Sequence, residues 1–319
     1  MTGNLNQASV SGHRYICAWC GTSSDGISLS CPGCGVTVNV KDLVTESGWT
    51  EAPGRKDMAK LQFGSSYCQI EGQYVPVADM SLSKDDSVYF AHHVLLWKDP
   101  AVTITNMPIK GAWKRVLAGL PVIMATARGP GHIAFSRDVP GETVALPIQP
   151  GHSVDTREHV FIVATGQVSY GFFQTGIWFT TQKEKETETH YPVGYMMDRF
   201  TAAQAPGLVL LHASGNVFVR KLQPGQTILV KPTALLFKDQ SVQMQLYFEH
   251  PSGAAPAGSG GLGGGLLGSI VNTLSSFGQR YIWLQLTGPG RVAVQSAFEP
   301  IEGESGTITS HSNALRKRW

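Results

Sequence analysis

The 319-residue sequence lacks the features of a membrane-spanning or strongly electrostatic protein. No uninterrupted run of about 18 or more apolar residues is present, so we expect no membrane-spanning helix. Residues 1–10 show no basic start followed by an apolar stretch, so no secretory signal is expected. Charged residues make up only 15% of the chain, and 25 basic against 23 acidic side chains give a net charge of +2. This balance disfavours nucleic acid as a partner. With no export signal in view, we expect a cytoplasmic protein.

The sequence also lacks the common catalytic motifs. A nucleophile elbow, a His-Glu-x-x-His helix and a phosphate loop are all absent. Residues 258–263 have the spacing of a dinucleotide fingerprint, but such matches arise by chance in a glycine-rich segment. His93 and His159 occupy equivalent positions of an internal repeat, and Asp155, Arg157 and His159 would share one strand face. That set could bind a metal or an anion, or act in acid–base chemistry, but we favour a structural role and expect no enzyme.

Cysteine is scarce, but its pattern is specific. Four of the five cysteines form two Cys-x-x-Cys pairs, and a glycine follows each pair. Two such turns supply four thiolates and leave no ligand position open, so a bound zinc ion would be structural. Without an export signal disulfides are disfavoured, and a redox centre needs only one pair. We therefore predict a zinc ribbon over residues 1–48, while the fifth cysteine, Cys68, is expected to be a buried thiol. The four zinc ligands are Cys17, Cys20, Cys31 and Cys34.

The predicted ribbon carries few cations. Between residues 13 and 48 only Arg14 and Lys41 are fully positive, too few to neutralise several phosphates. Trp19 could stack on a base, but a tryptophan in so small a module more often packs over the metal. We favour a protein-docking module and keep a nucleic-acid-binding regulator as the alternative.

A threefold internal repeat follows the ribbon. Residues 82–88 align without a gap with residues 148–154 and 222–228, and the register continues for about twenty residues. The second and third copies carry Pro-Gly turn dipeptides there, whereas the first has Lys84-Asp85-Asp86. Apolar residues then partly alternate with polar ones, as in half-buried strands. We predict an all-β fold of three repeated β-sandwich lobes, at about residues 61–135, 136–212 and 213–300, joined to the ribbon by a linker over residues 49–60.

Two insertions and the C-terminal end complete the expected organisation. Residues 183–190 are charged and predict a solvated hairpin tip. Residues 251–278 are glycine-rich and uncharged, and apolar residues recur there at helical spacing. Part of this insertion, residues 258–278, would pack on its own sandwich or a second subunit, contact a membrane surface, or form a mobile loop. Residues 301–319 are expected to form a flexible basic tail.

Three features of the sequence resemble those of a known protein family: the three lobes, the start at Gln69-Ile-Glu-Gly72 and Pro76-Val-Ala, and the closing Leu286-Thr-Gly-Pro-Gly290. The resemblance is to the altered-inheritance-of-mitochondria family, number twenty-four. That family's fold is similar to the tryptophan RNA-binding attenuation protein. The resemblance covers about residues 60–300 and implies β-sandwich lobes that assemble as a homotrimer, with a supporting role linked in mitochondrial members to inner-membrane organisation. Fold likeness alone does not transfer tryptophan or RNA binding. We expect a non-enzymatic, oligomeric scaffold or assembly protein, with a peripheral membrane association as an open alternative. An uncharacterised enzyme with a histidine-containing site is the third alternative.

Overall fold

The structure is a computed structural model that describes residues 14–16, 20–25, 31–35, 49–51, 60–107, 124–183, 186–249 and 281–312. The chain divides into two compact units, Met1–Glu51 and Ala52–Trp319. Regular structure in the described residues is β, apart from two short 3-10 turns, η2 (His92–Val94) and η3 (Pro232–Ala234). The predicted all-β fold is confirmed.

The first unit holds four of the five cysteines and three short strands. Strand β1 (Arg14–Ile16) pairs antiparallel with β2 (Ser23–Asp25), so that Arg14 faces Asp25. Strand β3 comprises Thr50–Glu51. Cys20 lies in the segment that joins β1 to β2.

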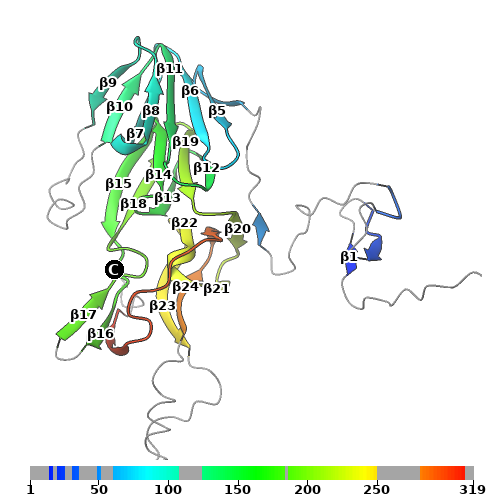
Figure 1. Cartoon of the computed structure of the whole chain (residues 1–319), viewed down its shortest axis with the longest axis vertical. Coiled ribbons are helices and arrows are strands. Elements are labelled where there is room, and N and C mark those ends of the chain that lie inside the picture. The colour runs from blue at the N-terminus through cyan, green and yellow to red at the C-terminus, as the bar shows by residue number, and fades with distance from the viewer. Residues whose placement is uncertain are drawn as a thin grey trace, which may run out of the picture. The chain divides into compact units, whose positions relative to one another are not determined.

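The second unit contains three copies of a six-strand arrangement (Figure 1). Two extra strands, β4 (Lys60–Phe63) and β5 (Ser66–Glu71), precede the first copy. The first copy comprises β6 (Val77–Leu82), β7 (Ser87–Ala91), β8 (Leu95–Lys98), β9 (Thr103–Asn106), β10 (Met124–Arg128) and β11 (Gly131–Ser136). The second comprises β12 (Glu142–Ile148), β13 (His152–Arg157), β14 (Phe161–Thr165), β15 (Val168–Gln174), β18 (Met196–Ala202) and β19 (Gly207–Ala213). The third comprises β20 (Val217–Leu222), β21 (Thr227–Val230), β22 (Leu235–Asp239), β23 (Gln243–Glu249), β24 (Tyr281–Thr287) and β25 (Gly290–Gln295).

Every copy forms two antiparallel half-sheets with the same strand order. The first, sixth and third strands pair in that order, as in β12-β19-β14, and the second, fifth and fourth strands pair separately, as in β13-β18-β15. Adjacent copies are then joined because a half-sheet of one copy continues into a half-sheet of the next. One sheet therefore reads β12-β19-β14-β7-β10-β9, and another contains the run β15-β18-β13-β22-β25-β20.

The turn between the first and second strands explains the one irregular copy. Gly151 and Gly225 have φ of +79° and +75°, the left-handed conformation that favours glycine at this turn position. In the first copy Asp86 instead fixes the turn, because its carboxylate accepts hydrogen bonds from the Ser66 and Ser83 hydroxyls at 2.6 and 2.8 Å. Burial raises the pKa of Asp86, but these hydrogen bonds, with one from the Ser65 N–H, outweigh it and lower the pKa.

The two largest clusters of buried side chains each draw on more than one copy. Phe90 and Phe135 of the first copy pack with ring centroids 4.8 Å apart, in a cluster that includes Ile162 of the second. Phe161 and Phe200 of the second copy pack equally closely, in a cluster that reaches Tyr89 and Phe237 of its neighbours. Burial of apolar side chains therefore holds the copies to one another as well as within themselves.

The charged insertion and the C-terminal end form a small sheet together. β16 (Phe179–Lys183) and β17 (Glu186–His190) make the hairpin that the charged stretch predicts, and β26 (Thr307–His311) pairs with the other side of β16. This corrects the expectation of a flexible tail over residues 301–319, since Ile301 is buried with Phe179 and Ile282 and anchors the segment. The insertion at residues 251–278 and the last residues, 313–319, lie outside the described residues.

Among the residues that the structure describes, none forms a helix of the length and hydrophobicity that a bilayer crossing requires.

Candidate functional site

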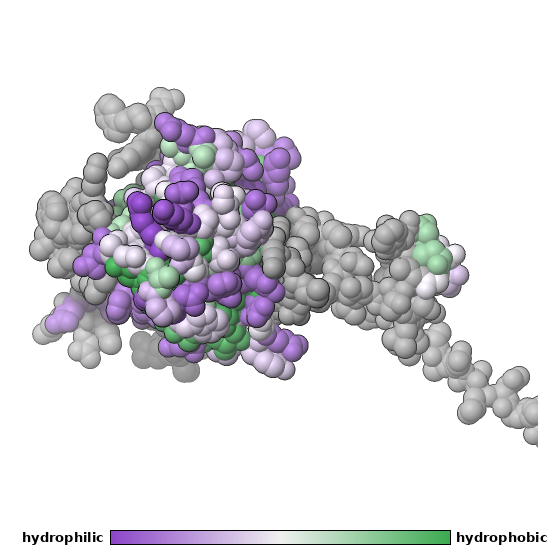
Figure 2. All heavy atoms as spheres, turned by 90° about the horizontal axis from the view of Figure 1, so that it is seen from above, coloured by the Kyte–Doolittle hydropathy of each residue, from purple (hydrophilic) through white to green (hydrophobic). Residues whose placement is uncertain are grey.

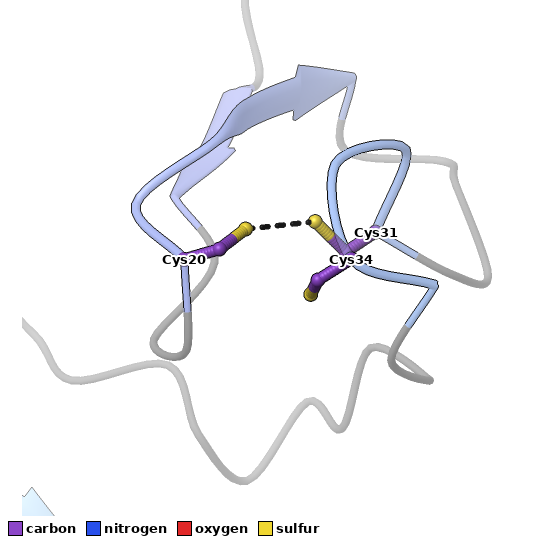
Figure 3. Close-up of side chains that lie close together, drawn as sticks. All are labelled: Cys20, Cys31 and Cys34. Atoms are coloured by element: carbon purple, nitrogen blue, oxygen red, sulfur yellow. Dashed lines mark hydrogen bonds between the residues drawn. The ribbon is translucent and has the colours of Figure 1, made fainter.

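The first unit brings three cysteine sulfurs together (Figure 3). The Sγ atoms of Cys20, Cys31 and Cys34 all lie within 4.8 Å of one another, and those of Cys20 and Cys31 are 3.5 Å apart. Sulfurs that share a tetrahedral zinc ion at about 2.3 Å are separated by roughly 3.8 Å, so this spacing fits a tetrathiolate site. Cys17, the fourth predicted ligand, lies outside the described residues.

Glycines allow the tight turn of the second pair. Gly35 has a φ of +73°, and its N–H donates to the Cys31 carbonyl at 2.8 Å. The Gly33 N–H lies 3.4 Å from Cys31 Sγ and donates to it. Backbone N–H groups directed at a sulfur stabilise its thiolate form, which is the form that binds metal.

The electrostatic environment of Cys20 also favours a thiolate. Hydrogen bonds with the side chain and then with the backbone of Thr22 lower the pKa of Cys20 from its ordinary value of 9.0 to about 6. Cys31 is buried, while Cys20 and Cys34 are exposed. Within the described parts of the chain, no other group of three histidine, cysteine or carboxylate ligand atoms converges in this way.

His93 and His159 lie at the meeting of the first two copies. Arg137 Nη1 donates to His93 Nε2 at 2.6 Å. Burial, and then the charges of Arg137 and His159, lower the pKa of His93, so its neutral form is favoured. His159 follows the end of β13 and has a φ of +66°, so it does not continue the strand face. The expected face of Asp155, Arg157 and His159 is therefore interrupted.

Asp155 belongs to a buried ion cluster that sequence analysis missed. Its carboxylate is fully buried and accepts from Arg199 Nε at 2.6 Å, Arg199 Nη2 at 3.0 Å and Lys238 Nζ at 2.8 Å. The cluster joins β13 to β18 in its own copy and to β22 in the next. Arg157 instead donates to the Thr233 carbonyl. These groups are used in holding strands together and do not converge on a common ligand position.

Cys68 is fully buried in the core of the first copy, as predicted. Burial, and then the charge of Asp79, raise the pKa of Cys68 to about 12. A thiol in this environment stays protonated and is unreactive.

Comparison with known proteins identifies the family. No curated protein sequence matches the chain significantly. A crystal structure of a protein from Streptococcus pyogenes is similar, with 15% sequence identity and a TM-score of 0.48, covering 73% of this chain and 94% of that chain. The mitochondrial biogenesis AIM24 family matches residues 68–297, most of the second unit. The resemblance seen in the sequence is thus confirmed, and the chain belongs to the mitochondrial biogenesis AIM24 family.

Proposed function

We propose that the protein is a non-enzymatic scaffold in a mitochondrial-biogenesis-related role, with a zinc-bound N-terminal unit that docks a protein partner. The family description names a cellular process and no reaction. The observation that carries the docking module is the convergence of three thiols in a unit distinct from the β body. With Cys17 as fourth ligand the metal would have no open position, so it would stabilise the unit and bind no substrate.

The charged groups of the β body support a scaffold role. Asp155, Lys238 and Arg199 neutralise one another at a strand junction, and Asp86 is satisfied by serine hydroxyls and a backbone N–H. Such groups stabilise a rigid body and leave its exposed surfaces to carry the function.

Elemental analysis of the purified chain tests the zinc site. We expect one zinc per chain in the wild type and in Cys68→Ser, and loss of zinc in Cys34→Ser and Cys17→Ser. Zinc retained in both of the latter variants, or two disulfides found by mass spectrometry under reducing purification, would contradict the docking module.

Light scattering tests the oligomer that a scaffold requires, and a monomer at micromolar concentration would count against it. Membrane contact stays a prediction for residues 258–278. It is tested by co-sedimentation with anionic and neutral vesicles, comparing the full chain with a variant that lacks these residues; equal recovery of the two would remove membrane contact from the proposal.

The cytoplasmic location is likewise a prediction, while the family description refers to mitochondria. Fractionation of cells that express the chain at native level decides between them.

A further inference from the structure

Copies of the repeat meet through one junction, which the second unit uses twice. The second strand of one copy pairs antiparallel with the third strand of the next, as β7 with β14 and β13 with β22. The registers are equivalent. Phe90 faces Val163 at the first junction, and Thr156, in the position of Phe90, faces Phe237 at the second.

The same hydrogen bond extends both junctions. The Gly166 N–H donates to the Ser87 carbonyl at 2.8 Å, and the Gln240 N–H donates to the Ser153 carbonyl at 3.1 Å. The repeat alignment makes these two donors equivalent to each other and these two acceptors equivalent to each other. The junction is therefore a reproducible property of the repeat.

At each end of the repeat array, one strand of the kind that forms this junction has no partner strand from another copy among the described strands. β8 is the third strand of the first copy and β21 is the second strand of the third copy, and among the described strands both lie at sheet edges. Figure 1 shows β8 in the upper part of the second unit and β21 in the lower part.

Strand β8 has the sequence of a buried junction strand but is exposed. It reads Leu-Leu-Trp-Lys, where the equivalent part of β22 reads Leu-Leu-Phe-Lys. Leu96 is 53% exposed and Trp97 48% exposed, whereas their equivalents in β22, Leu236 and Phe237, are 0% and 2% exposed. The difference follows from β13, which pairs with β22, whereas no described strand pairs with β8 on the equivalent side. Seen from above, the body carries hydrophobic side chains among hydrophilic ones (Figure 2).

Strand β21 shows the complementary exposure. Leu229 is 41% exposed, while the residues at its position in the other copies, Tyr89 and Asp155, are 4% and 0% exposed. Free edges as such are ordinary here, since the fourth strands β9, β15 and β23 lie at sheet edges in all three copies. Among the described strands, β8 and β21 alone lie at an edge where their equivalents pair with a strand of another copy.

The geometry points to head-to-tail self-assembly, in which β21 of one chain pairs antiparallel with β8 of a second copy. The internal register places Val230 opposite Trp97, Leu229 opposite Lys98 and Ile228 opposite Asp99. This inference rests on the scaffold role proposed above and names the partner as a second copy. The two surfaces differ, so the contact is heterologous and either closes a ring or extends a filament.

One difference weakens the junction between chains. Pro100 stands at the position of Gly166 and Gln240 and has no N–H, so the hydrogen bond that extends both internal junctions is missing. The assembly therefore depends on the remaining backbone pairs and on covering Leu96 and Trp97, and we expect it to be reversible and concentration-dependent.

An ion pair at the second internal junction shows how the proposed register can be tested by changing charges. Asp155 and Lys238 are directly opposite and form an ion pair at 2.8 Å. The equivalent pair between chains is Leu229 and Lys98. Leu229→Lys would place like charges opposite each other, while Leu229→Asp would reproduce the internal ion pair.

The experiment is light scattering of the full chain across a micromolar concentration series. We expect an oligomer for the wild type and Leu229→Asp. Leu229→Lys should raise the dissociation concentration at least tenfold, toward the 34.3 kDa mass of one chain. Adding Lys98→Glu to Leu229→Lys should restore assembly. Tyr247→Lys, which alters an exposed residue of the fourth strand β23, is the matched control and should assemble like the wild type.

The outcomes separate this junction from the broader proposal. An oligomer that Leu229→Lys leaves intact, or that Lys98→Glu fails to rescue, overturns the junction and leaves the scaffold with another interface. A monomeric wild type overturns both the junction and self-assembly, while the zinc measurement still reports separately on the docking unit. Circular dichroism confirms that each variant is folded, because both positions are exposed in a single chain.

Discussion

The two units of the chain achieve stability by different means. The first has short strands and a cluster of three thiols, and Cys31 is its one described apolar residue that is buried. The second has extended clusters of buried aromatic and aliphatic side chains that cross from copy to copy. A small module cannot bury enough apolar surface to offset its conformational entropy. In the proposed zinc-bound unit, the metal would supply the difference.

Removal of the metal should produce the largest difference in stability between the two units. A strong zinc chelator should abolish hydrogen-exchange protection in the first unit, because structural zinc contributes roughly 10–16 kcal/mol to the folding of such modules. Protection in the core strands of the second unit should be unchanged. Hydrogen-exchange mass spectrometry with and without chelator makes the measurement, and loss of protection in both units would show that the comparison is wrong.

The strongest test within the β body is the buried ion cluster. Asp155→Asn leaves Lys238 charged and buried without its counter-ion, which should cost about 3–5 kcal/mol in the free energy of unfolding. Lys238→Met added to Asp155→Asn should recover part of that loss, because the remaining cation of the cluster, Arg199, is 32% exposed and can be hydrated. Urea unfolding of the single and double variants decides the matter; a loss below about 1 kcal/mol for Asp155→Asn would contradict the role assigned to the cluster.

A matched pair of aromatic truncations compares a covered strand with its uncovered equivalent. Phe237→Ala should cost about 3–5 kcal/mol, because the side chain is 2% exposed in the core. Trp97→Ala should cost less than about 1 kcal/mol in a single chain, since nearly half of the side chain already contacts water. Both are measured by urea unfolding in the Leu229→Lys background, and similar losses would mean that β8 is covered in the isolated chain.

The smallest effect concerns pH. Burial, and then the charge of Arg137, lower the pKa of His212 below its usual 6.5, and the pKa of His93 is lowered in the same way. The unfolded chain then binds more protons than the folded one, so stability is full above about pH 6.5 and is lost as the pH falls below it. We expect the urea midpoint to decrease between pH 7 and 5, and His212→Gln to reduce that decrease. His152→Gln, at an exposed position, is the control and should keep the wild-type slope.

Sequence patterns revealed the repeat because its signals are local. Pro150-Gly151 and Pro224-Gly225 mark a turn whatever surrounds them, and the apolar positions that follow keep their register in all three copies. Which strands pair between copies could not be predicted, because both half-sheets of a copy have similar alternation. The exposed Leu96 and Trp97 look like core residues in the sequence, and only the pairing order shows that their covering strand is missing.

The charged residues were harder to interpret than the cysteines. Two Cys-x-x-Cys pairs have few structural explanations, and the structure brings Cys20, Cys31 and Cys34 together. Asp155 was grouped with Arg157 and His159 by strand periodicity, but its partners come from strands distant in sequence. One signal was available: Lys238 ends a run of apolar residues on a core strand, where a lysine needs a buried counter-ion.

Because each copy gives half of its strands to one sheet and half to another, no copy is a domain that could be excised. A gene fragment encoding a single six-strand unit would produce a polypeptide with two open flanks, stable only when identical molecules completed them. Fusion of three such units in one chain makes two of these junctions intramolecular, so they do not depend on protein concentration. In the proposed assembly, only the junction between chains would depend on it.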